Sequence, residues 1–377
     1  MKTWVEISKE NILNNITSLK SLLRPETLFM AVIKSNAYGH GLEEVSKICV
    51  QSKGVNWFGV DNIDEALALR KQGIKQPILI LGYIPFDMVE EAAENDISFV
   101  AYNTEMLDYL ENYKLQTKNY KLRIHIKVET GTARQGIEGK ELVEFIKKAS
   151  KLPSVIIEGI YTHYANIEDT TDSSYAMEQL KRFNENVAAA EEILKIPIKH
   201  SACSAALVNY PETHFDMVRA GISLYGMWSS NEAKLVAKQK NINLSLKSAL
   251  TWKTQIAQIK DLPPNTPIGY GLTEKTKRAT RIGVLPIGYW DGYDRKLSNI
   301  GGVLVDGKRA KILGRVCMNM AIIDITDIPE AKLFNSAILL GKSGEEEITA
   351  EELAKKVGTI NYEITTRINP LIKRMIR

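Results

Sequence analysis

The sequence predicts an α/β protein in which an N-terminal TIM (β/α)8 barrel is followed by a C-terminal, mostly-β domain. From Leu28 to about Tyr225, eight short apolar runs alternate with amphipathic segments of helical length, which is the pattern of repeated βα units. Reactive side chains lie at the C-terminal ends of several runs, the face at which barrels carry their active sites. After Met227 the helical period largely disappears.

The predicted strands are short and mostly continuous in apolar character, as expected for strands that are buried on both faces of a parallel sheet. The eight strands are 29–33, 57–60, 78–82, 98–102, 122–128, 155–162, 198–202 and 216–219. Periodicity alone does not separate a closed barrel from an open doubly wound sheet. Five polar residues fall at the C-terminal ends of strands one, five, six, seven and eight, namely Lys34, Lys127, His163, Ser204 and Arg219. Only a closed barrel brings strands one and eight together.

The helical segments between these strands carry their own start signals. The segment from Ile63 to Lys71 has two acidic residues in its first turn, where they favour the positive end of the helix dipole. The segment from Thr104 to Tyr113 begins on a threonine that can cap the first turn. Two further helices are predicted from Lys140 to Lys148 and from Tyr175 to Leu194.

The last third of the chain is predicted to be rich in β-structure. Val236 to Ile242 has the composition of a linker, and Leu250 to Ile259 partly alternates between apolar and polar residues. One late helix is predicted around Ala350–Lys356. We therefore expect a barrel domain over residues 1–238 and a β-rich domain over residues 239–377.

The composition limits the classes of function. Charged residues make up 25% of the chain and the net charge is only +4; no basic block with interleaved aromatic residues indicates nucleic-acid binding. No apolar run approaches the ~18–20 residues needed to span a bilayer, and the start of the chain does not resemble a signal peptide. Cys49, Cys203 and Cys317 are few, odd in number and widely spaced. We expect a cytoplasmic chain without disulfides or a metal site and with no membrane contact of its own.

The most informative segment is residues 31–41, Ala-Val-Ile-Lys-Ser-Asn-Ala-Tyr-Gly-His-Gly. Lys34 ends a buried strand, where partial desolvation suits a nucleophilic amine; by itself it would more often simply end the strand. The whole string resembles the pyridoxal-phosphate lysine motif of the alanine racemase family. The resemblance extends from Thr3-Trp4-Val5-Glu6-Ile7 to Thr359-Ile360-Asn361-Tyr362-Glu363.

This resemblance implies an amino-acid racemase that depends on pyridoxal 5'-phosphate. The cofactor delocalises the carbanion left when the Cα proton is removed, and two acid/base groups are needed, one on each face. By resemblance, Lys34 holds the cofactor as an imine and is one base, and Tyr270 is the other. Because tyrosine is a poor base at neutral pH, nearby cations must support its phenolate. His163 and Arg219 match the family residues that are linked to the tyrosine and the cofactor.

The resemblance also assigns the groups that would bind the cofactor. Arg219 would face the pyridine nitrogen, where a fixed cation disfavours protonation of the ring and so suppresses side reactions such as transamination. Tyr38, Ser204 and the backbone amides of Gly221 and Ile222 match the phosphate site, at the loop after strand eight where barrels often bind phosphate.

Substrate contacts follow from the same resemblance. Arg134 matches the arginine that grips the substrate carboxylate with two hydrogen bonds. Lys127 matches a lysine that is carbamylated in many members and would then orient Arg134; an unmodified lysine in a polar network is the alternative. The remaining assigned positions are Met318, Asn319 and Asn369 toward the substrate, with Cys203, Tyr289 and Cys317 in support.

Three positions depart from the family pattern. Cys203 replaces the usual Asn, Asn319 replaces the usual Asp, and Arg367-Ile-Asn-Pro370 lacks a tyrosine that normally closes the site. Smaller groups there leave room for a substrate hydroxyl, as in the serine racemases of vancomycin resistance, whose racemase unit is the cytoplasmic part of a membrane protein. The predicted substrates are therefore serine and alanine, supplying D-amino acid for cell-wall precursors; the alternative is drift in an enzyme that still prefers alanine.

The resemblance implies a homodimer, because Tyr270 and Cys317-Met318-Asn319 belong to the second domain, which in the family reaches the partner's barrel. Two other functions remain open. A barrel-type pyridoxal-phosphate decarboxylase would place a carboxylate at the ring nitrogen, so Arg219 opposes it. A non-enzymatic cofactor carrier built from a barrel alone would need no second base, so the domain carrying Tyr270 opposes it.

Overall fold

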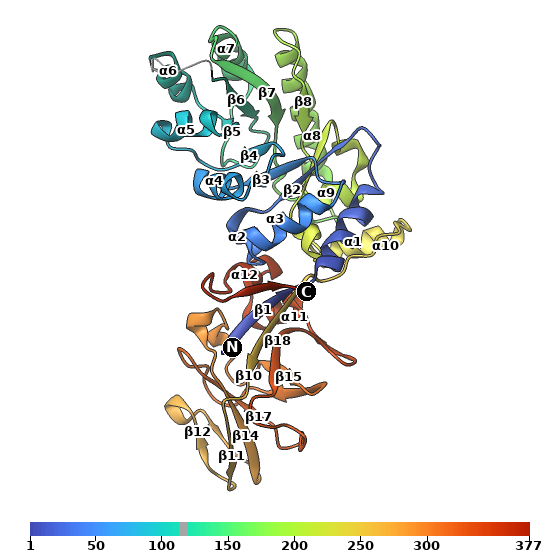
Figure 1. Cartoon of the computed structure of the whole chain (residues 1–377). Helices are drawn as coiled ribbons and strands as arrows, with labels where there is room; N and C mark the ends of the chain where they lie inside the picture. Colours follow the sequence, from blue (N-terminus) through green and yellow to red (C-terminus); the bar gives the residue numbers. More distant parts are fainter. Residues whose placement is uncertain (113–119) are drawn as a thin grey trace. The chain divides into compact units, whose positions relative to one another are not determined.

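The structure is a computed structural model that describes residues 1–112 and 120–377, and it divides into two compact units. One unit, residues 10–35 and 46–247, contains the parallel sheet; we call it the barrel unit. The other unit, residues 1–9, 36–45 and 248–377, is rich in antiparallel strands; we call it the β-rich unit (Figure 1).

The barrel unit contains eight parallel strands in the order β8-β7-β6-β5-β4-β3-β2-β9. Their bounds are β2 (Leu28–Val32), β3 (Trp57–Val60), β4 (Ile78–Ile80), β5 (Ile97–Ala101), β6 (Leu122–Lys127), β7 (Val155–Tyr161), β8 (Ile198–His200) and β9 (Met217–Ala220). The two end strands are joined, because the Asp216 N–H donates to Lys199 O and the Arg219 N–H donates to Ala202 O, each at 3.0 Å. The predicted barrel is confirmed.

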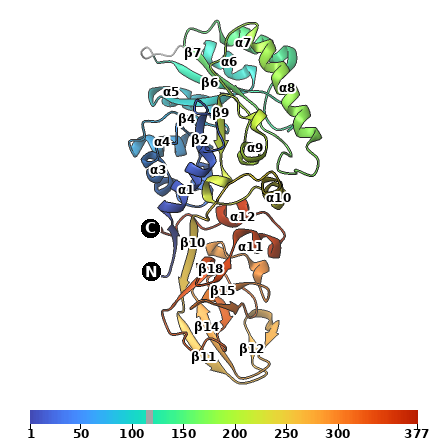
Figure 2. The same ribbon diagram turned by 90° about the vertical axis from the view of Figure 1, so that its right-hand side faces the viewer.

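The buried character of the strands explains why the sequence located them well. β3, β4, β5 and β9 are buried at every position, as both faces of a barrel strand must be. In both views the connecting helices, among them α3, α4, α7 and α8, lie outside these strands (Figures 1 and 2).

The helices of the barrel unit largely follow the sequence signals. They are α1 (Lys9–Lys20), α2 (Lys34–Tyr38), α3 (Leu42–Gln51), α4 (Ile63–Lys71), α5 (Val89–Glu94), α6 (Thr104–Asn112), α7 (Gly139–Ala149), α8 (Ser174–Glu191), α9 (Ser204–Asn209) and α10 (Asn231–Gln239); α1 to α3 share residues with the β-rich unit. The predicted end of the 104–113 helix, Tyr113, lies outside the described residues. The linker predicted at 236–242 is wrong over its first half. α10 extends to Gln239, because Ser230 caps it by accepting from the Ala233 N–H and because Ala233 and Ala237 are buried.

The β-rich unit is organised around one mixed sheet of order β16-β15-β18-β10-β1-β20, with β19 paired to β18. Its strands are β1 (Thr3–Ile7), β10 (Leu250–Gln255), β15 (Gly302–Val305), β16 (Lys308–Lys311), β18 (Ser336–Ser343), β19 (Glu346–Ile348) and β20 (Arg374–Ile376). Smaller sheets contain β11 (Gln258–Leu262), β14 (Thr280–Leu285) and β17 (Ala321–Asp324), and β12 (Pro267–Ile268) with β13 (Glu274–Lys275). Two helices follow, α11 (Ala350–Val357), as predicted, and α12 (Asn361–Thr366).

The units differ from the expected domains of 1–238 and 239–377, because residues 1–9 and 36–45 belong to the β-rich unit and the barrel unit extends to residue 247. β1 pairs antiparallel with β10 and parallel with β20, so the first residues of the chain belong to the β-rich unit. Val5 and Ile7 are fully buried. A local pattern identifies such a strand but not its partners, which lie more than 200 residues away.

The structure also reports on thiols and membrane segments. Cys49, Cys203 and Cys317 are free cysteines. Within residues 1–112 and 120–377, no helix has the length and apolar character needed to cross a membrane.

Candidate active site

Lys34 lies two residues after the last residue of β2, at the C-terminal end of the barrel. The ladder between β2 and β3 continues past the strand, since the Ile33 N–H donates to Gly59 O at 2.8 Å. The Lys34 Nζ then lies 3.1 Å from Asp61 Oδ1, and the lysine side chain is 38% exposed. The amine is thus held at the strand end and remains open to a reactant.

The turn after Lys34 is left-handed. Ser35, Asn36, Ala37 and Tyr38 all have φ between 53° and 55°, a conformation that costs about 1–2 kcal/mol per residue for L-amino acids. Local hydrogen bonds oppose that cost, because Asn36 Oδ1 accepts from the Leu42 N–H and Asn36 O accepts from the Gly41 N–H. Such strain clusters at functional sites.

Arg219 lies inside the barrel and is only 4% exposed. Its guanidinium donates to Thr162 O and Ser201 O, each at 2.8 Å, and to His200 O at 3.1 Å. It also contacts His200 Nδ1 at 2.9 Å; because guanidinium has no acceptor, this nitrogen must accept. The cation is therefore fixed by neutral acceptors.

The contact with His200 begins a chain of polar groups through the barrel interior. With its Nδ1 accepting, a neutral His200 carries its proton on Nε2, which lies 3.0 Å from His125 Nδ1. His125 Nε2 is 3.4 Å from Glu158 Oε2. Burial, followed by the charge of Arg219, lowers the pKa of His200 well below its usual value. Gly159 permits this arrangement, since a Cβ there would collide with the His125 ring.

Lys127 is the last residue of β6, and His163 lies two residues after the end of β7. Both residues are surrounded by cations. Burial, followed by the charges of Arg134 and Arg219, lowers the pKa of Lys127 to about 7. Burial, followed by the charge of Arg219, lowers the pKa of His163 well below its usual value. His163 Nδ1 lies 3.4 Å from Arg219 Nη2. A neutral imidazole and a partly neutral lysine are therefore expected near pH 7.

Arg134 is carried by the loop after β6, and the Glu129 carboxylate organises that loop. Glu129 accepts the N–H groups of Thr132 at 2.6 Å and Arg134 at 3.2 Å. Gly136 lets the chain pass close by, since a Cβ there would collide with the Glu129 backbone. Arg134 itself is exposed, which leaves its guanidinium available to an anion.

Ser204 and the loop after β9 are already joined. Ser204 Oγ accepts from the Gly221 N–H at 3.0 Å and from the Ser223 N–H at 3.4 Å. Ile222 begins a 3-10 turn directly after this glycine. The hydroxyl proton of Ser204 is left to donate to an anion. Cys203 occupies the N-cap position of α9 without a side-chain cap hydrogen bond, and burial raises the pKa of its thiol, so it is not an activated nucleophile.

The other predicted site residues lie in the β-rich unit. Tyr38 lies close to Tyr362, with 6.1 Å between the ring centroids. Tyr270 is 73% exposed and stands on a turn between Gly269 and Gly271, which both have positive φ.

Four more of these residues gather around the turn that begins at Tyr289. The Tyr289 N–H donates to Cys317 O at 3.1 Å, and the Trp290 N–H donates to Met318 O at 3.0 Å. Asn319 is exposed beside them. Asn369 is engaged in its own turn, because its Nδ2 donates to Trp290 O and its Oδ1 accepts from the Leu371 N–H.

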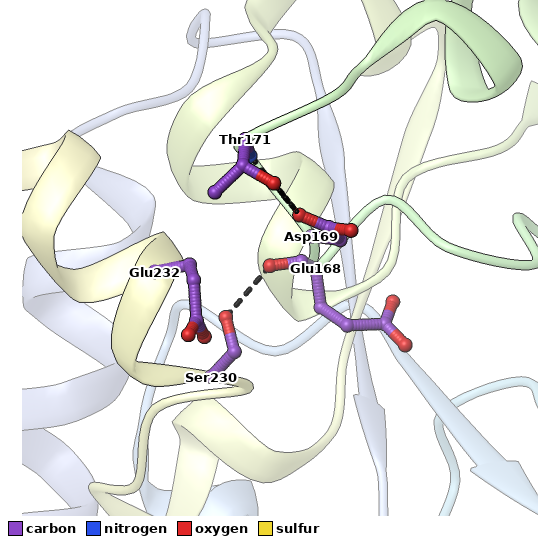
Figure 3. A pocket seen from close by; sticks show the side chains of 5 residues that line it. All are labelled: Glu168, Asp169, Thr171, Ser230 and Glu232. Atoms are coloured by element: carbon purple, nitrogen blue, oxygen red, sulfur yellow. Dashed lines mark hydrogen bonds between the residues drawn. The ribbon is translucent and has the colours of Figure 1, made fainter.

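One hollow of the barrel unit is lined by acidic residues. Glu168, Asp169, Thr171, Ser230 and Glu232 line a cavity of about 390 Å³ (Figure 3). Ser230 Oγ donates to Glu168 O at 2.7 Å. Its three carboxylates would repel an anionic ligand, and among the described residues no group of His, Cys, Asp or Glu side chains is arranged to hold a metal ion.

Sequence reasoning missed Asp61, His125, His200 and Glu158. Asp61 had a usable signal, because it is the first residue after a predicted strand that neighbours the strand of Lys34. The other three lie within predicted strands, and their contacts depend on register and side-chain direction inside the barrel.

The fold and these side chains define a barrel protein with a lysine amine and several cations at the C-terminal ends of its strands. Residues 7–229 match the family model "Alanine racemase, N-terminal domain", and residues 249–376 match "Alanine racemase, C-terminal domain". The chain is 40% identical over 374 residues to an alanine racemase of Methanococcus maripaludis, covering 99% of this chain and 98% of that one. It is 38% identical over 378 residues to one of Leptospira interrogans, covering 99% and 95%.

Solved structures agree with these matches. An alanine racemase from Bacillus anthracis with bound L-Ala-P superimposes with a TM-score of 0.91 at 36% identity, covering 100% of this chain and 95% of that one. One from Clostridium difficile 630 gives 0.92 at 34% identity, covering 100% and 96%. The chain belongs to the alanine racemase family and is a pyridoxal-phosphate-dependent amino-acid racemase.

The residues present fit pyridoxal 5'-phosphate. The cofactor carries an aldehyde and a phosphate, and the barrel unit offers an accessible amine on Lys34 and the hydroxyl proton of Ser204. Arg219 adds a fixed, buried cation in the same unit. When bound, the cofactor supplies the electron sink that makes a Cα proton removable.

Proposed function

We propose that this protein interconverts L- and D-alanine by two-base proton transfer at Cα. The observation that supports this most is Arg219, which is buried and held by three carbonyls and the acceptor nitrogen of a histidine. A cation at the ring nitrogen keeps the ring unprotonated and limits competing reactions. The decarboxylase alternative would require a carboxylate at this position.

The residues of the chain then take the following roles. Lys34 holds the cofactor and, when displaced, moves the Cα proton on one face; Tyr270 does so on the other. Arg134 binds the substrate carboxylate. Tyr38, Ser204, Gly221 and Ile222 bind the phosphate, and His163 supports the site beside Arg219. Met318, Asn319, Tyr289 and Cys317 surround the substrate from the β-rich unit, where Asn369 acts by shaping a turn.

Lys127 is proposed to carry a carbamate. Only a neutral amine attacks CO2, and a pKa of about 7 provides that form at neutral pH. The carbamate would add a negative charge among Arg134, Arg219 and Lys34, whose charges act on Lys127.

We propose that two copies of the chain build each site. Tyr270, Trp290 and Met318 are 73%, 61% and 55% exposed. The Trp290 N–H donates to Met318 O, so two of these large side chains lie together, and exposed apolar patches mark interaction sites. A second copy that covers them would place Tyr270 beside Lys34 of the partner. Supply of D-alanine to cell-wall precursors and a cytoplasmic location remain predictions of the family resemblance.

The function is tested by incubating the protein with pyridoxal phosphate and L-alanine and measuring both enantiomers. A racemase gives D-alanine until the two are equal. A decarboxylase would release CO2 and an amine, and a carrier would bind cofactor with no product. Either of the last two outcomes would reject the proposal.

Borohydride is expected to fix the cofactor on Lys34. Reduction makes the carbon–nitrogen link permanent, and peptide mapping then locates it. Lys34 is expected because its amine is accessible at the strand end. Lys127 is the internal control, since it is buried; a label on Lys127, or none at all, would exclude Lys34 as the cofactor lysine.

Serine is expected to be a second substrate. The turn at Asn369-Pro370 lacks the usual tyrosine, and a roomier pocket loses only about 1–3 kcal/mol of packing around the methyl group of alanine. Pro370→Tyr should lower kcat/KM for serine more than for alanine. Asn369→Tyr is the paired variant, but it also removes the two hydrogen bonds of the Asn369 side chain. If the unmodified protein strongly prefers alanine and neither variant changes that preference, the serine prediction is wrong and alanine remains as the substrate.

A further inference from the structure

Asp61 makes the closest charged contact with the proposed cofactor lysine. Its Oδ1 lies 3.1 Å from the Lys34 Nζ, and the two side chains are 46% and 38% exposed. In the ladder of β2 and β3, Val32 faces Gly59, so Lys34 and Asp61 each come two residues later at neighbouring strand ends. The pair follows directly from the register of the barrel.

The backbone of Asp61 is held on both sides. Its N–H donates to Glu65 Oε2 at 2.9 Å, and its carbonyl accepts from the Gly82 N–H at 3.1 Å. Glu65 is itself fixed by the cap of α4, since its N–H donates to Asn62 Oδ1 at 3.0 Å. A Cβ at Gly82 would collide with the Asp61 carbonyl. These contacts direct the carboxylate toward Lys34.

The other charged groups around Lys34 are mostly cations. Lys127 at the end of β6 and His163 after β7 both feel the charge of Lys34, and Arg134 and Arg219 act on the same two residues. Two further carboxylates are occupied by backbone N–H groups: Glu129, whose charge acts on Lys127, accepts from its own loop, and Glu65 accepts from the Asp61 N–H. Asp61 therefore places a negative charge against the Lys34 amine among groups that are otherwise mostly positive.

We propose that Asp61 is a positioning residue that holds the protonated Lys34 amine at the strand end whenever the lysine is not bonded to the cofactor. This rests on the proposed function, in which Lys34 alternates between holding the cofactor and moving a proton. To bond with the cofactor aldehyde, the ammonium must give a proton to solvent; the C=N bond then forms and the aldehyde oxygen leaves as water. Asp61 opposes the first of these steps and keeps the displaced lysine close to its working position.

The test compares Asp61→Asn with the unmodified protein and with Asp64→Asn. Asparagine keeps the size and an acceptor oxygen but removes the charge; Asp64 is an exposed carboxylate in the first turn of α4. The protein is freed of cofactor, and the rate of pyridoxal-phosphate uptake is followed by absorbance across pH. For Asp61→Asn, uptake should be about two- to five-fold faster across the profile, the size expected when a half-exposed ion pair that holds the amine is removed. Asp64→Asn should match the unmodified protein.

Superimposable profiles for Asp61→Asn and the unmodified protein, with unchanged circular dichroism, would overturn the inference. So would an equal shift in Asp64→Asn, which would indicate a general charge effect. If cofactor attaches at Lys34 and Asp61→Asn shifts the profile, but alanine is not racemised, the proposed function fails and the role of Asp61 stands. If alanine is racemised and the profile of Asp61→Asn is unshifted, the proposed function stands and the role of Asp61 is rejected.

Discussion

Tyr270→Phe is expected to lower racemisation by about 100- to 10,000-fold, the range associated with the loss of an acid/base group. Cofactor binding should survive, because the amine of Lys34 and the donors at Ser204 belong to the barrel unit. Lys34 would still move a proton on its own face. One enantiomer should therefore keep exchanging its Cα proton with solvent while the other almost stops.

The measurement is incorporation of deuterium into L-alanine and D-alanine, incubated separately in D2O. Tyr83→Phe is the matched control, since Tyr83 is an exposed tyrosine of the barrel unit. It should leave both exchange rates unchanged. If Tyr270→Phe lowers the exchange rates of the two enantiomers equally, Tyr270 does not act as the base on a single face of the substrate.

Arg219→Glu is the second change with a large expected effect. A carboxylate at the ring nitrogen would favour its protonation and strengthen the electron sink. Long-wavelength absorbance should accumulate, racemisation should fall by about 100-fold or more, and keto-acid formation by transamination should rise.

The structure predicts a cost in stability as well. Thr162 O and Ser201 O would lose their donors, and a buried carboxylate would face carbonyls, a loss of about 3–5 kcal/mol. Arg219→Lys keeps the charge and is the control; it should retain the original product profile. If Arg219→Glu folds and its spectrum and products are unchanged, Arg219 does not contact the cofactor ring.

Much of the fold could be predicted because the barrel strands are local and uniformly apolar. The run at 57–60 and the helix at 63–71 match the structure residue for residue. β1 and α10 show where prediction from local sequence patterns fails. The partners of β1 come from the far end of the chain, and α10 depends on a cap and two small buried residues within a polar segment.

The candidate site was predicted where a residue ends or follows a strand. Lys34, Lys127, His163 and Arg219 are of this kind, and the structure brings Lys127, His163 and Arg219 together electrostatically with Lys34. Asp61 and the contacts from His200 to Glu158 required the register of neighbouring strands. The engagement of Asn369 in its own turn could not be predicted from residue type, because an asparagine side chain serves a turn or a ligand equally well.

Mixing two inactive variants tests whether two bases from two copies of the chain serve one site. Lys34→Ala and Tyr270→Phe are each expected to lack racemase activity. In a dimer with one copy of each, one site would carry both changes and the other neither. Co-expression with random pairing should therefore restore about a quarter of the activity of the unmodified protein, as the symmetry of a two-fold dimer requires. If mixed dimers form and racemise no alanine, Lys34 and Tyr270 do not act together across two copies, and the account is contradicted.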